Sequence, residues 1–126
     1  MDLSGRGARQ GLGRTGERLA ALQLEQSGYT ILERNFRCRY GEIDLVAEHE
    51  ADLVFIEVKT RRGMSHGLPE EAVNYRKQQK IIQVSQYYLF QHDYALRDWR
   101  VDVVAVQLSV TGHLEAIRIY QHAFTE

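Results

Sequence analysis

The sequence contains a single cysteine, Cys38, and a single proline, Pro69. One cysteine cannot form an internal disulfide, and a chain without a disulfide framework suits a reducing compartment. No apolar run reaches the roughly 18–20 residues that span a bilayer. The arginine-containing N-terminus also lacks the apolar segment of a secretory signal. We therefore expect a cytoplasmic protein that does not associate with membranes.

The net charge is only −1, but the charges are unevenly distributed. Residues 42–57 carry six acids and no Lys or Arg, whereas residues 1–40 carry seven arginines against four acids, and residues 59–80 carry six bases against two acids. An acidic segment between basic flanks suits a cation site next to a surface that binds a polyanion. Arginine outnumbers lysine by 13 to 3, which favours phosphate binding, although high-GC codon usage gives the same bias.

A chain of 126 residues fits one domain with one core. We expect a flexible arm over residues 1–12 and a single domain over residues 13–126. Hydrophobic periodicity and turn residues predict the order α-β-β-β-α-β-β. The predicted elements are a helix over 15–27 with Leu19, Ala20 and Leu22 inside, strands over 29–37, 42–48 and 53–60, a helix that starts near Pro69 or, preferably, Asn74 and ends near His92, and strands over 100–108 and 114–120. The order indicates an α/β fold with a central mixed sheet flanked by helices. The polar connection over 61–71 is a candidate mobile loop.

The second and third predicted strands are joined by a four-residue loop, which predicts a hairpin. If Glu48 faces Leu53, then Asp44 falls opposite Glu57, and directly opposed residues share a face of the sheet. Lys59 projects to the same face as Glu57, because side chains alternate along a strand. Two carboxylates and one ammonium group are therefore predicted to converge.

The strand that contains Glu57 begins apolar on both faces, which is typical of a strand covered on both sides. Its charges, Glu57 and Lys59, come only at its C-terminal end, where open α/β sheets bind ligands. Opposed carboxylates repel unless a cation bridges them, and oxygen ligands suit Mg²⁺ or Mn²⁺. Such a metal activates water at a phosphoryl group, with Lys59 as an electrostatic stabiliser. From the residues alone, a solvated surface with ordinary ion pairs explains the pattern equally well.

The segment GEIDLVAEHEADLVFIEVKTRR, over residues 41–62, resembles the active-site hairpin of the PD-(D/E)xK nuclease superfamily. It has Asp44, a 12-residue spacer and then Glu57-Val58-Lys59. Together with GERLAALQLEQSGYTILERNFRCRYGEIDLVA, GLPEEAV, RVDVVAV and the terminal HAF, it is similar to the bacterial YraN family of endonuclease-like proteins. That family is related in fold to archaeal Holliday-junction resolvases. The resemblance runs from about residue 13 to residue 124 and implies a restriction-endonuclease-like sandwich.

The resemblance also implies roles for individual residues. Asp44, Glu57 and Glu17 would hold Mg²⁺ or Mn²⁺, and Lys59 would be the catalytic cation. The proline of the superfamily motif is absent, because Ile43 precedes Asp44. Glu42 points to the same face as Asp44 and is a candidate auxiliary acid. From the residues alone, Glu17 is better explained as an acid that the positive end of a helix dipole favours.

Basic residues flank the predicted site and extend the interpretation to the substrate. They are Arg61, Arg62, Arg76, Lys77 and Lys80, which are expected to contact phosphates on either side of the scissile one without reading sequence. A solvated helix face explains the last three equally well.

These features predict a metal-dependent endonuclease that hydrolyses DNA phosphodiesters, with DNA expected over RNA and branched or structured DNA as a candidate substrate. A homodimer would suit a four-way junction, since a two-fold enzyme can cut two symmetric strands. One alternative is a nucleic-acid-binding module that keeps the nuclease fold without turnover. Another is a partner-binding protein whose charges only form ion pairs.

Overall fold

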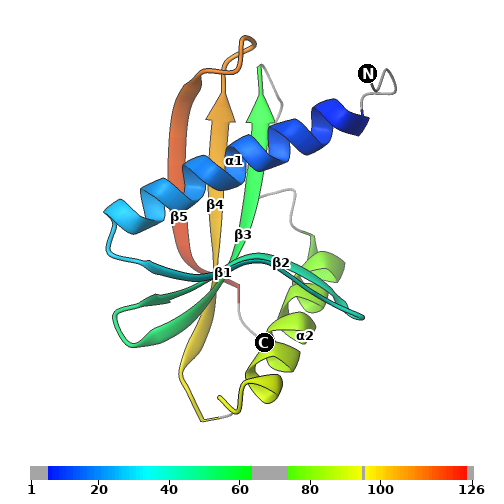
Figure 1. Ribbon diagram of the computed structural model, residues 1–126, viewed down its shortest axis with the longest axis vertical. Coiled ribbons are helices and arrows are strands. Elements are labelled where there is room, and N and C mark those ends of the chain that lie inside the picture. The colour runs from blue at the N-terminus through cyan, green and yellow to red at the C-terminus, as the bar shows by residue number, and fades with distance from the viewer. Residues whose placement is uncertain (1–5, 64–73, 95, 125–126) are drawn as a thin grey trace.

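The computed structural model describes residues 6–63, 74–94 and 96–124, with side chains described from residue 11 onwards. The described part of the chain forms α1 (Arg6–Gln26), β1 (Thr30–Cys38), β2 (Gly41–His49), β3 (Asp52–Arg62), α2 (Tyr75–Gln91), β4 (Trp99–Leu108) and β5 (Leu114–Phe124) (Figure 1). These described elements follow the predicted order α-β-β-β-α-β-β. Most of the connection predicted over 61–71, including Pro69, lies outside the described residues, and α2 begins beside Asn74 as preferred.

The strands form one sheet in the order β1-β2-β3-β4-β5. Neighbouring strands are antiparallel except β3 and β4, which run parallel. Parallel neighbours need a crossover connection, and α2 lies between these two strands in the chain. The sheet is thus mixed, as the sequence predicts, and the molecule has a mixed α/β fold.

The two helices cover opposite faces of the sheet, and β3 is buried between them. On one face, Val54 and Ile56 belong to the same cluster of buried side chains as Ala20 of α1. On the other face, Phe55 belongs to a cluster with Ile81 of α2. The central, doubly covered strand predicted from its apolar pattern is confirmed.

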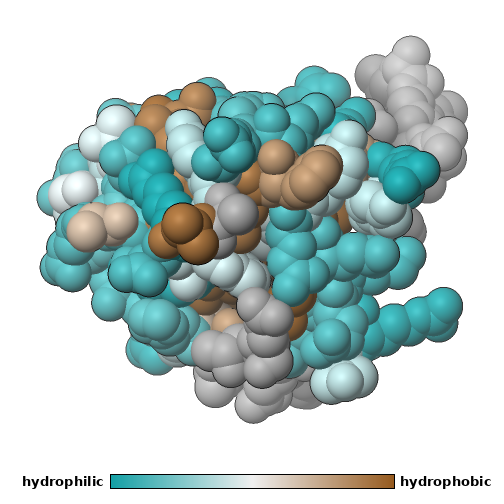
Figure 2. Space-filling view, turned by 90° about the horizontal axis from the view of Figure 1, so that it is seen from below, coloured by the Kyte–Doolittle hydropathy of each residue, from teal (hydrophilic) through white to brown (hydrophobic). Residues whose placement is uncertain are grey.

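The face of the molecule that lies at the bottom of Figure 1 is mostly polar. Figure 2 shows a largely hydrophilic face on which hydrophobic side chains form only small, separate patches. Phe90 and Leu96 are among the exposed apolar side chains of the protein. Scattered apolar residues of this kind are ordinary on a protein surface.

The first helix differs from its prediction in length and in the side it buries. It begins at Arg6, well before Thr15, so residues 6–12 of the predicted arm are helical. Leu22 is 53% exposed, while Leu24 is fully buried. The buried face of the helix runs through Ala20, which sits one turn before Leu24, and this rotation turns Leu22 to solvent.

The hairpin between β2 and β3 has the predicted register but a shorter loop. Glu48 pairs with Leu53, as expected, and His49 also pairs with Asp52. Only two residues remain in the loop, and Glu50 adopts a left-handed conformation with φ 55°. A positive φ at this position allows the tight two-residue turn.

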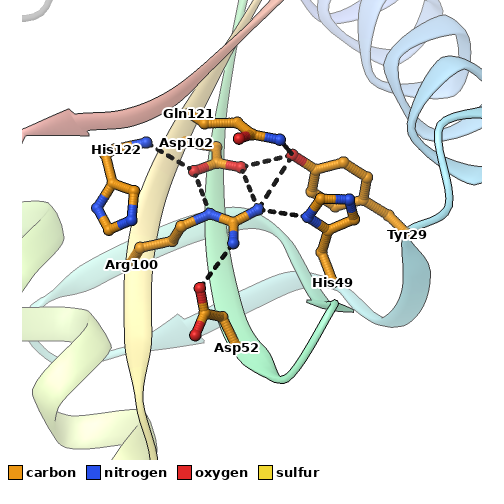
Figure 3. Close-up of polar contacts among 7 residues, drawn as sticks. All are labelled: Tyr29, His49, Asp52, Arg100, Asp102, Gln121 and His122. Carbon is orange, nitrogen blue, oxygen red and sulfur yellow. Dashed lines mark hydrogen bonds and ion pairs between the residues drawn. The ribbon is translucent and has the colours of Figure 1, made fainter.

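A buried network of hydrogen bonds and ion pairs connects the strands at one end of the sheet (Figure 3). It comprises Tyr29 before β1, His49 at the end of β2, Asp52 at the start of β3, Arg100 and Asp102 on β4, and Gln121 and His122 on β5. Sequence reasoning missed it, because its members come from five separate segments.

Arg100 is the centre of this network. Its guanidinium Nη1 lies 2.7 Å from Asp52 Oδ2, and its Nε lies 3.0 Å from Asp102 Oδ1. Asp102 is fully buried and also accepts a hydrogen bond from the Tyr29 hydroxyl at 2.7 Å. Arg100 Nη2 is 2.7 Å from His49 Nδ1. Each buried charge is thus paired and hydrogen-bonded, which is the condition under which a core tolerates it.

We expect Arg100→Met to lower the free energy of unfolding by about 3–5 kcal/mol, because Asp102 would be left as an uncompensated buried charge. Arg37→Met is the matched control, since its side chain is 76% exposed in its ion pair with Glu42 and such pairs contribute about 0–1 kcal/mol. Urea denaturation measures both variants. If both variants lost the same small free energy of unfolding, the buried network would stabilise the protein no more than an exposed ion pair does.

Gly16 brings α1 into close contact with β3. A Cβ atom at this position would overlap the Thr60 hydroxyl, whereas a Cβ atom at Gly11 would meet nothing within 4 Å. Glycine weakens the interior of a helix relative to alanine, so its presence at position 16 reflects the space available. This contact sets how closely the next residue, Glu17, approaches β3.

Gly16→Ala should destabilise the protein by about 1–3 kcal/mol, because the overlap with Thr60 forces α1 away from the sheet. Gly11→Ala, on the same helix in open space, should instead stabilise it by up to about 1 kcal/mol. Thermal unfolding followed by circular dichroism compares the two. A stabilising Gly16→Ala would contradict the close contact.

Candidate functional site

The candidate site lies where β2 separates from β3. The pairing of these strands runs from His49–Asp52 to Leu45–Ile56, while β3 continues beside β4 as far as Arg62. Just past the last pair, Asp44 Oδ2 accepts a hydrogen bond from the Val58 main-chain N–H at 2.7 Å. The carboxylate therefore satisfies a main-chain donor at the point where the ladder ends.

The pairing ends at Leu45–Ile56, so Asp44 and Glu57, the next residue on each strand, do not form the ladder pair that the sequence predicts. Their carboxyl groups nevertheless lie close together, since Glu57 raises the pKa of Asp44 through its charge and a hydrogen bond. Glu57 is buried, with only 7% of its surface exposed. The prediction that the charges mark the C-terminal end of the strand is wrong, because β3 extends to Arg62. The departure of β2, and not the end of β3, opens the sheet beside the two carboxylates.

The folded structure disfavours the ionised form of Asp44. Burial and the nearby charges of Glu57 and Glu17 raise its pKa from the usual 3.8 to about 8, although the hydrogen bond from Val58 acts in the opposite direction. Two carboxylates in one site cannot both ionise cheaply without a cation. Burial is the largest cause of the shift, so Asp44 keeps its proton unless a positive charge approaches it.

Two lysines contact the same oxygen of Glu57. Lys77 Nζ on α2 lies 3.0 Å from Glu57 Oε1, and Lys59 Nζ on β3 lies 3.5 Å from it. Burial and the neighbouring Lys77 lower the pKa of Lys59. Burial also lowers the pKa of Lys77, but its contacts with Lys59 and Glu57 outweigh this effect and raise it.

The position of Lys77 follows from the way α2 begins. Asn74 caps the helix, and its Oδ1 accepts a hydrogen bond from the Lys77 main-chain N–H at 2.9 Å. Asparagine is among the preferred residues at this position because its short side chain satisfies a free donor of the first turn. The cap fixes the first turn, and Lys77 reaches the sheet from it.

Glu17 lies near the two carboxylates, as the resemblance implies. Burial raises its pKa first of all, a hydrogen bond from Asn35 lowers it, and the charges of Glu42 and Glu57 raise it further. The alternative explanation by the helix dipole is wrong, because α1 starts at Arg6 and Glu17 lies near the middle of the helix. The dipole acts only within the first and last turns.

A cavity of about 160 Å³ opens beside the carboxylate pair. Its lining comprises Gly41, Glu42, Asp44, Glu57, Lys77, Lys80, Ile81 and Val84, from β2, β3 and α2. Glu42 therefore joins the site, although its carboxylate also accepts from Arg37 Nε at 3.0 Å. The cavity has acids on its sheet side and two lysines on its helix side.

We tested whether these residues suit a divalent cation. Within the described ranges, no group of three His, Cys, Asp or Glu side chains is placed closely enough to hold one. The donor chemistry of two residues nevertheless fits, because Asp44 and Glu57 offer hard oxygen ligands beside the cavity. Asp44 and Glu57 would hold the ion, and Glu17 acts on Asp44 through its charge without completing a group of three ligands.

The predicted phosphate-binding residues divide into two groups. Lys77 and Lys80 line the cavity, and Arg61 shares the face of β3 that carries Glu57. Arg62 points to the other face, where its Nε donates to the Val110 carbonyl at 2.9 Å. Arg76 is exposed on α2 outside the cavity lining.

Sequence reasoning missed the contact between Lys77 and Glu57. The sequence predicts Lys77 as a phosphate contact on a helix face, with no link to the acids. The one available signal was Glu57 itself, because a carboxylate on a doubly covered strand needs a partner. The pattern along the chain could not say which base supplies it.

The fold and site together define a mixed α/β protein in which a buried and a half-buried acid lie beside two lysines. The sequence profile described as Uncharacterised protein family UPF0102 matches residues 16–106. The chain therefore belongs to this family, which is the YraN family that its sequence resembles.

Curated relatives carry the same family name. A UPF0102 protein of Caldanaerobacter subterraneus is 45% identical over 98 residues, covering 78% of this chain and 80% of the relative. Relatives from Clostridium botulinum and Nocardia farcinica are 44% and 43% identical over 116 residues, with 90% and 88% of this chain and 93% and 91% of the relatives covered. These names state no activity. Among the described residues, no helix is long and apolar enough to cross a membrane.

We predict that the stability of the protein in EDTA falls as the pH rises from about 4 to about 8. The folded state binds a proton at Asp44 that the unfolded state has already released over this range, so stability is lost with rising pH. Asp44→Asn keeps the acceptor for Val58 and removes the charge, and should raise the Tm at pH 8 by at least about 4 °C.

The gain should be smaller at pH 5, where Asp44 of the folded wild type is already protonated. Glu115→Gln, an exposed acid on β5, is the control and should leave the pH profile unchanged. Differential scanning calorimetry at the two pH values checks both variants. A Tm for Asp44→Asn that is equal to or below that of the wild type at pH 8 would contradict the predicted cost of ionising Asp44 in the folded state.

Proposed function

We propose that this protein is a metal-dependent nuclease of the PD-(D/E)xK superfamily, with a restriction-endonuclease-like fold, that hydrolyses DNA phosphodiesters. Branched or structured DNA is the candidate substrate. The observation that carries the proposal is the close approach of the half-buried Asp44 to the buried Glu57, with Lys59 on the same face of β3, at the point where the sheet opens. Ordinary surface ion pairs need neither burial nor opposed carboxylates.

The chemistry of the site supports hydrolysis at phosphorus. Mg²⁺ or Mn²⁺, when bound, supplies an activated water and neutralises charge on the phosphoryl group. Asp44 and Glu57 would hold the ion, with Glu17 beside them. Lys59 would donate to a phosphoryl oxygen whose negative charge grows in the transition state. The water oxygen bonds to phosphorus, the bond to the leaving oxygen breaks, and the leaving oxygen takes a proton.

Basic side chains around the cavity support a polyanionic substrate. Lys77 and Lys80 line its helix side, and Arg61 extends the same face of β3. These cations would contact phosphates next to the scissile one and hold the strand in register without reading bases. A nucleic-acid substrate, with DNA expected over RNA, and a cytoplasmic location follow from this proposal, and a homodimer would suit a four-way junction.

One observation favours a second candidate function, a nucleic-acid-binding module without turnover. Lys77 Nζ sits 3.0 Å from Glu57 Oε1, so that an ammonium group already neutralises one of the two carboxylates. If Lys77 kept this position in every state, Glu57 would not be available to bind a metal ion. The site could then contact phosphates through its basic side chains but could not catalyse hydrolysis.

We expect cleavage of labelled four-way-junction, flap, single-stranded and duplex DNA in Mg²⁺ or Mn²⁺, and none in EDTA. Glu57→Gln and Lys59→Met should each lower the rate by at least about 100-fold, the usual loss when one charge-stabilising group is removed. Arg62→Gln is the control, because Arg62 bonds to Val110 on the opposite face. Gel analysis of initial rates measures all four proteins.

The outcome of this assay separates the two functions. Metal-dependent cleavage that both site variants lose, and that Arg62→Gln keeps, supports the nuclease. DNA binding without cleavage in any metal, unchanged in Glu57→Gln, supports the binding module. Cleavage that survives both site substitutions would falsify the assignment of the active site.

A further inference from the structure

We propose that Lys77 is an internal cation that occupies Glu57 in the metal-free protein and leaves it when a divalent cation binds, so that its ammonium group becomes free for a substrate phosphate. This inference rests on the proposed function, since it deepens the role of the same site. It assigns Lys77 a place in metal binding as well as in contact with nucleic acid.

The contact geometry is the first argument. Lys77 Nζ lies 3.0 Å from Glu57 Oε1, closer than the 3.5 Å of Lys59 Nζ to the same oxygen. The Glu57 side chain is only 9% exposed. The two ammonium groups beside Glu57 repel an approaching metal ion, so withdrawal of one of them favours binding of the ion.

The exposure of the two lysine side chains indicates which one withdraws. The Lys77 side chain is 42% exposed, whereas that of Lys59 is 20% exposed. Lys59 projects from the interior of β3, which pairs with β4 along its length. Lys77 lies in the first turn of α2, and its flexible stem can swing towards solvent without moving the helix. Lys77 is therefore the group that a cation displaces.

Charge balance explains why the displaced group is a lysine of the protein. Without a cation, Glu57 would be a buried charge beside a second acid, which is costly. Lys77 offsets this cost in the metal-free state. A divalent ion near Glu57 supplies twice the charge and repels the ammonium group. The released Lys77 Nζ stays on the wall of the cavity, where a phosphate would replace Glu57 as its partner.

Lys80 provides a matched comparison. It lies one turn further along α2 and lines the same cavity, so it contributes the same charge to the site at short range. Within the described part of the chain, Lys80 forms no ion pair with Glu57 or any other acid. A variant without Lys80 therefore measures how the loss of one nearby positive charge changes metal affinity. A variant without Lys77 measures the same effect and, in addition, the loss of the ammonium group that competes with the metal for Glu57.

The experiment is a titration of the full chain with Mn²⁺ in the absence of nucleic acid, in which electron paramagnetic resonance measures the free ion. Wild type, Lys77→Met and Lys80→Met are compared, because methionine keeps the aliphatic stem and removes the charge. We expect Lys77→Met to tighten the Kd for Mn²⁺ by at least about tenfold and Lys80→Met to tighten it by less than about threefold. Circular dichroism checks that the variants fold.

The second arm measures binding of a fluorescein-labelled four-way junction by anisotropy, with Ca²⁺ as the ion so that cleavage is suppressed. Wild type should bind the junction more tightly in Ca²⁺ than in EDTA. Lys77→Met should lose most of this gain in spite of its tighter metal site, because the freed ammonium group is missing. This opposite movement of metal affinity and junction affinity is the signature of a displaced cation.

The outcomes separate this inference from the proposed function. If wild type binds Mn²⁺ and Lys77→Met binds it equally or more weakly, the displacement is wrong while the metal site stands. An equal gain in Lys77→Met and Lys80→Met overturns it in the same way, as a general charge effect. If no variant binds Mn²⁺ at millimolar concentration, the metal site and the inference both fail.

Discussion

The separation of β2 from β3 is the constraint on which the candidate site depends. As long as the two strands pair, their main-chain groups satisfy each other and their side chains pack under the helices. Once β2 departs, Val58 needs a new acceptor, and the Asp44 carboxylate supplies it. The same departure opens the cavity that α2 covers from the other side. A local break in the ladder thus holds an acid in place and exposes it to a ligand.

This arrangement puts charge where the fold would otherwise place apolar side chains. Asp44 lies beside Glu57 at a cost, since burial and the charge of Glu57 raise the pKa of Asp44. At the other end of the sheet, by contrast, Arg100 and Asp102 form a network in which each buried charge is matched. The matched network suits a structural role, whereas a carboxyl group that resists ionisation beside a cavity suits a ligand. The difference between them supports the proposed function more directly than the fold does.

Much of the fold could be predicted from the sequence because it follows from short-range patterns. The continuous apolar run at the start of β3 indicated burial on both faces, and the hairpin register followed from the spacing of the two strands. Boundaries were less accurate, because they depend on contacts across the molecule. The first helix begins at Arg6, well before its predicted start at residue 15, and Leu22 has the same propensity whether it faces the sheet or the solvent. The two-residue turn at Glu50 relies on a left-handed conformation that glutamate seldom adopts.

The sequence by itself determined the order of the described elements, the proximity of Asp44 and Glu57, and the shared face of Glu57 and Lys59, because strand periodicity and hairpin pairing are local rules. Only the tertiary structure decided that Lys77 contacts Glu57, that Glu17 lies beside the site and not at a helix end, and that Arg62 points away from it. These facts depend on how two helices dock on opposite faces of the sheet. Docking is set by the shape and packing of residues far apart in the chain, such as Gly16 against Thr60, and no periodicity along the sequence records it.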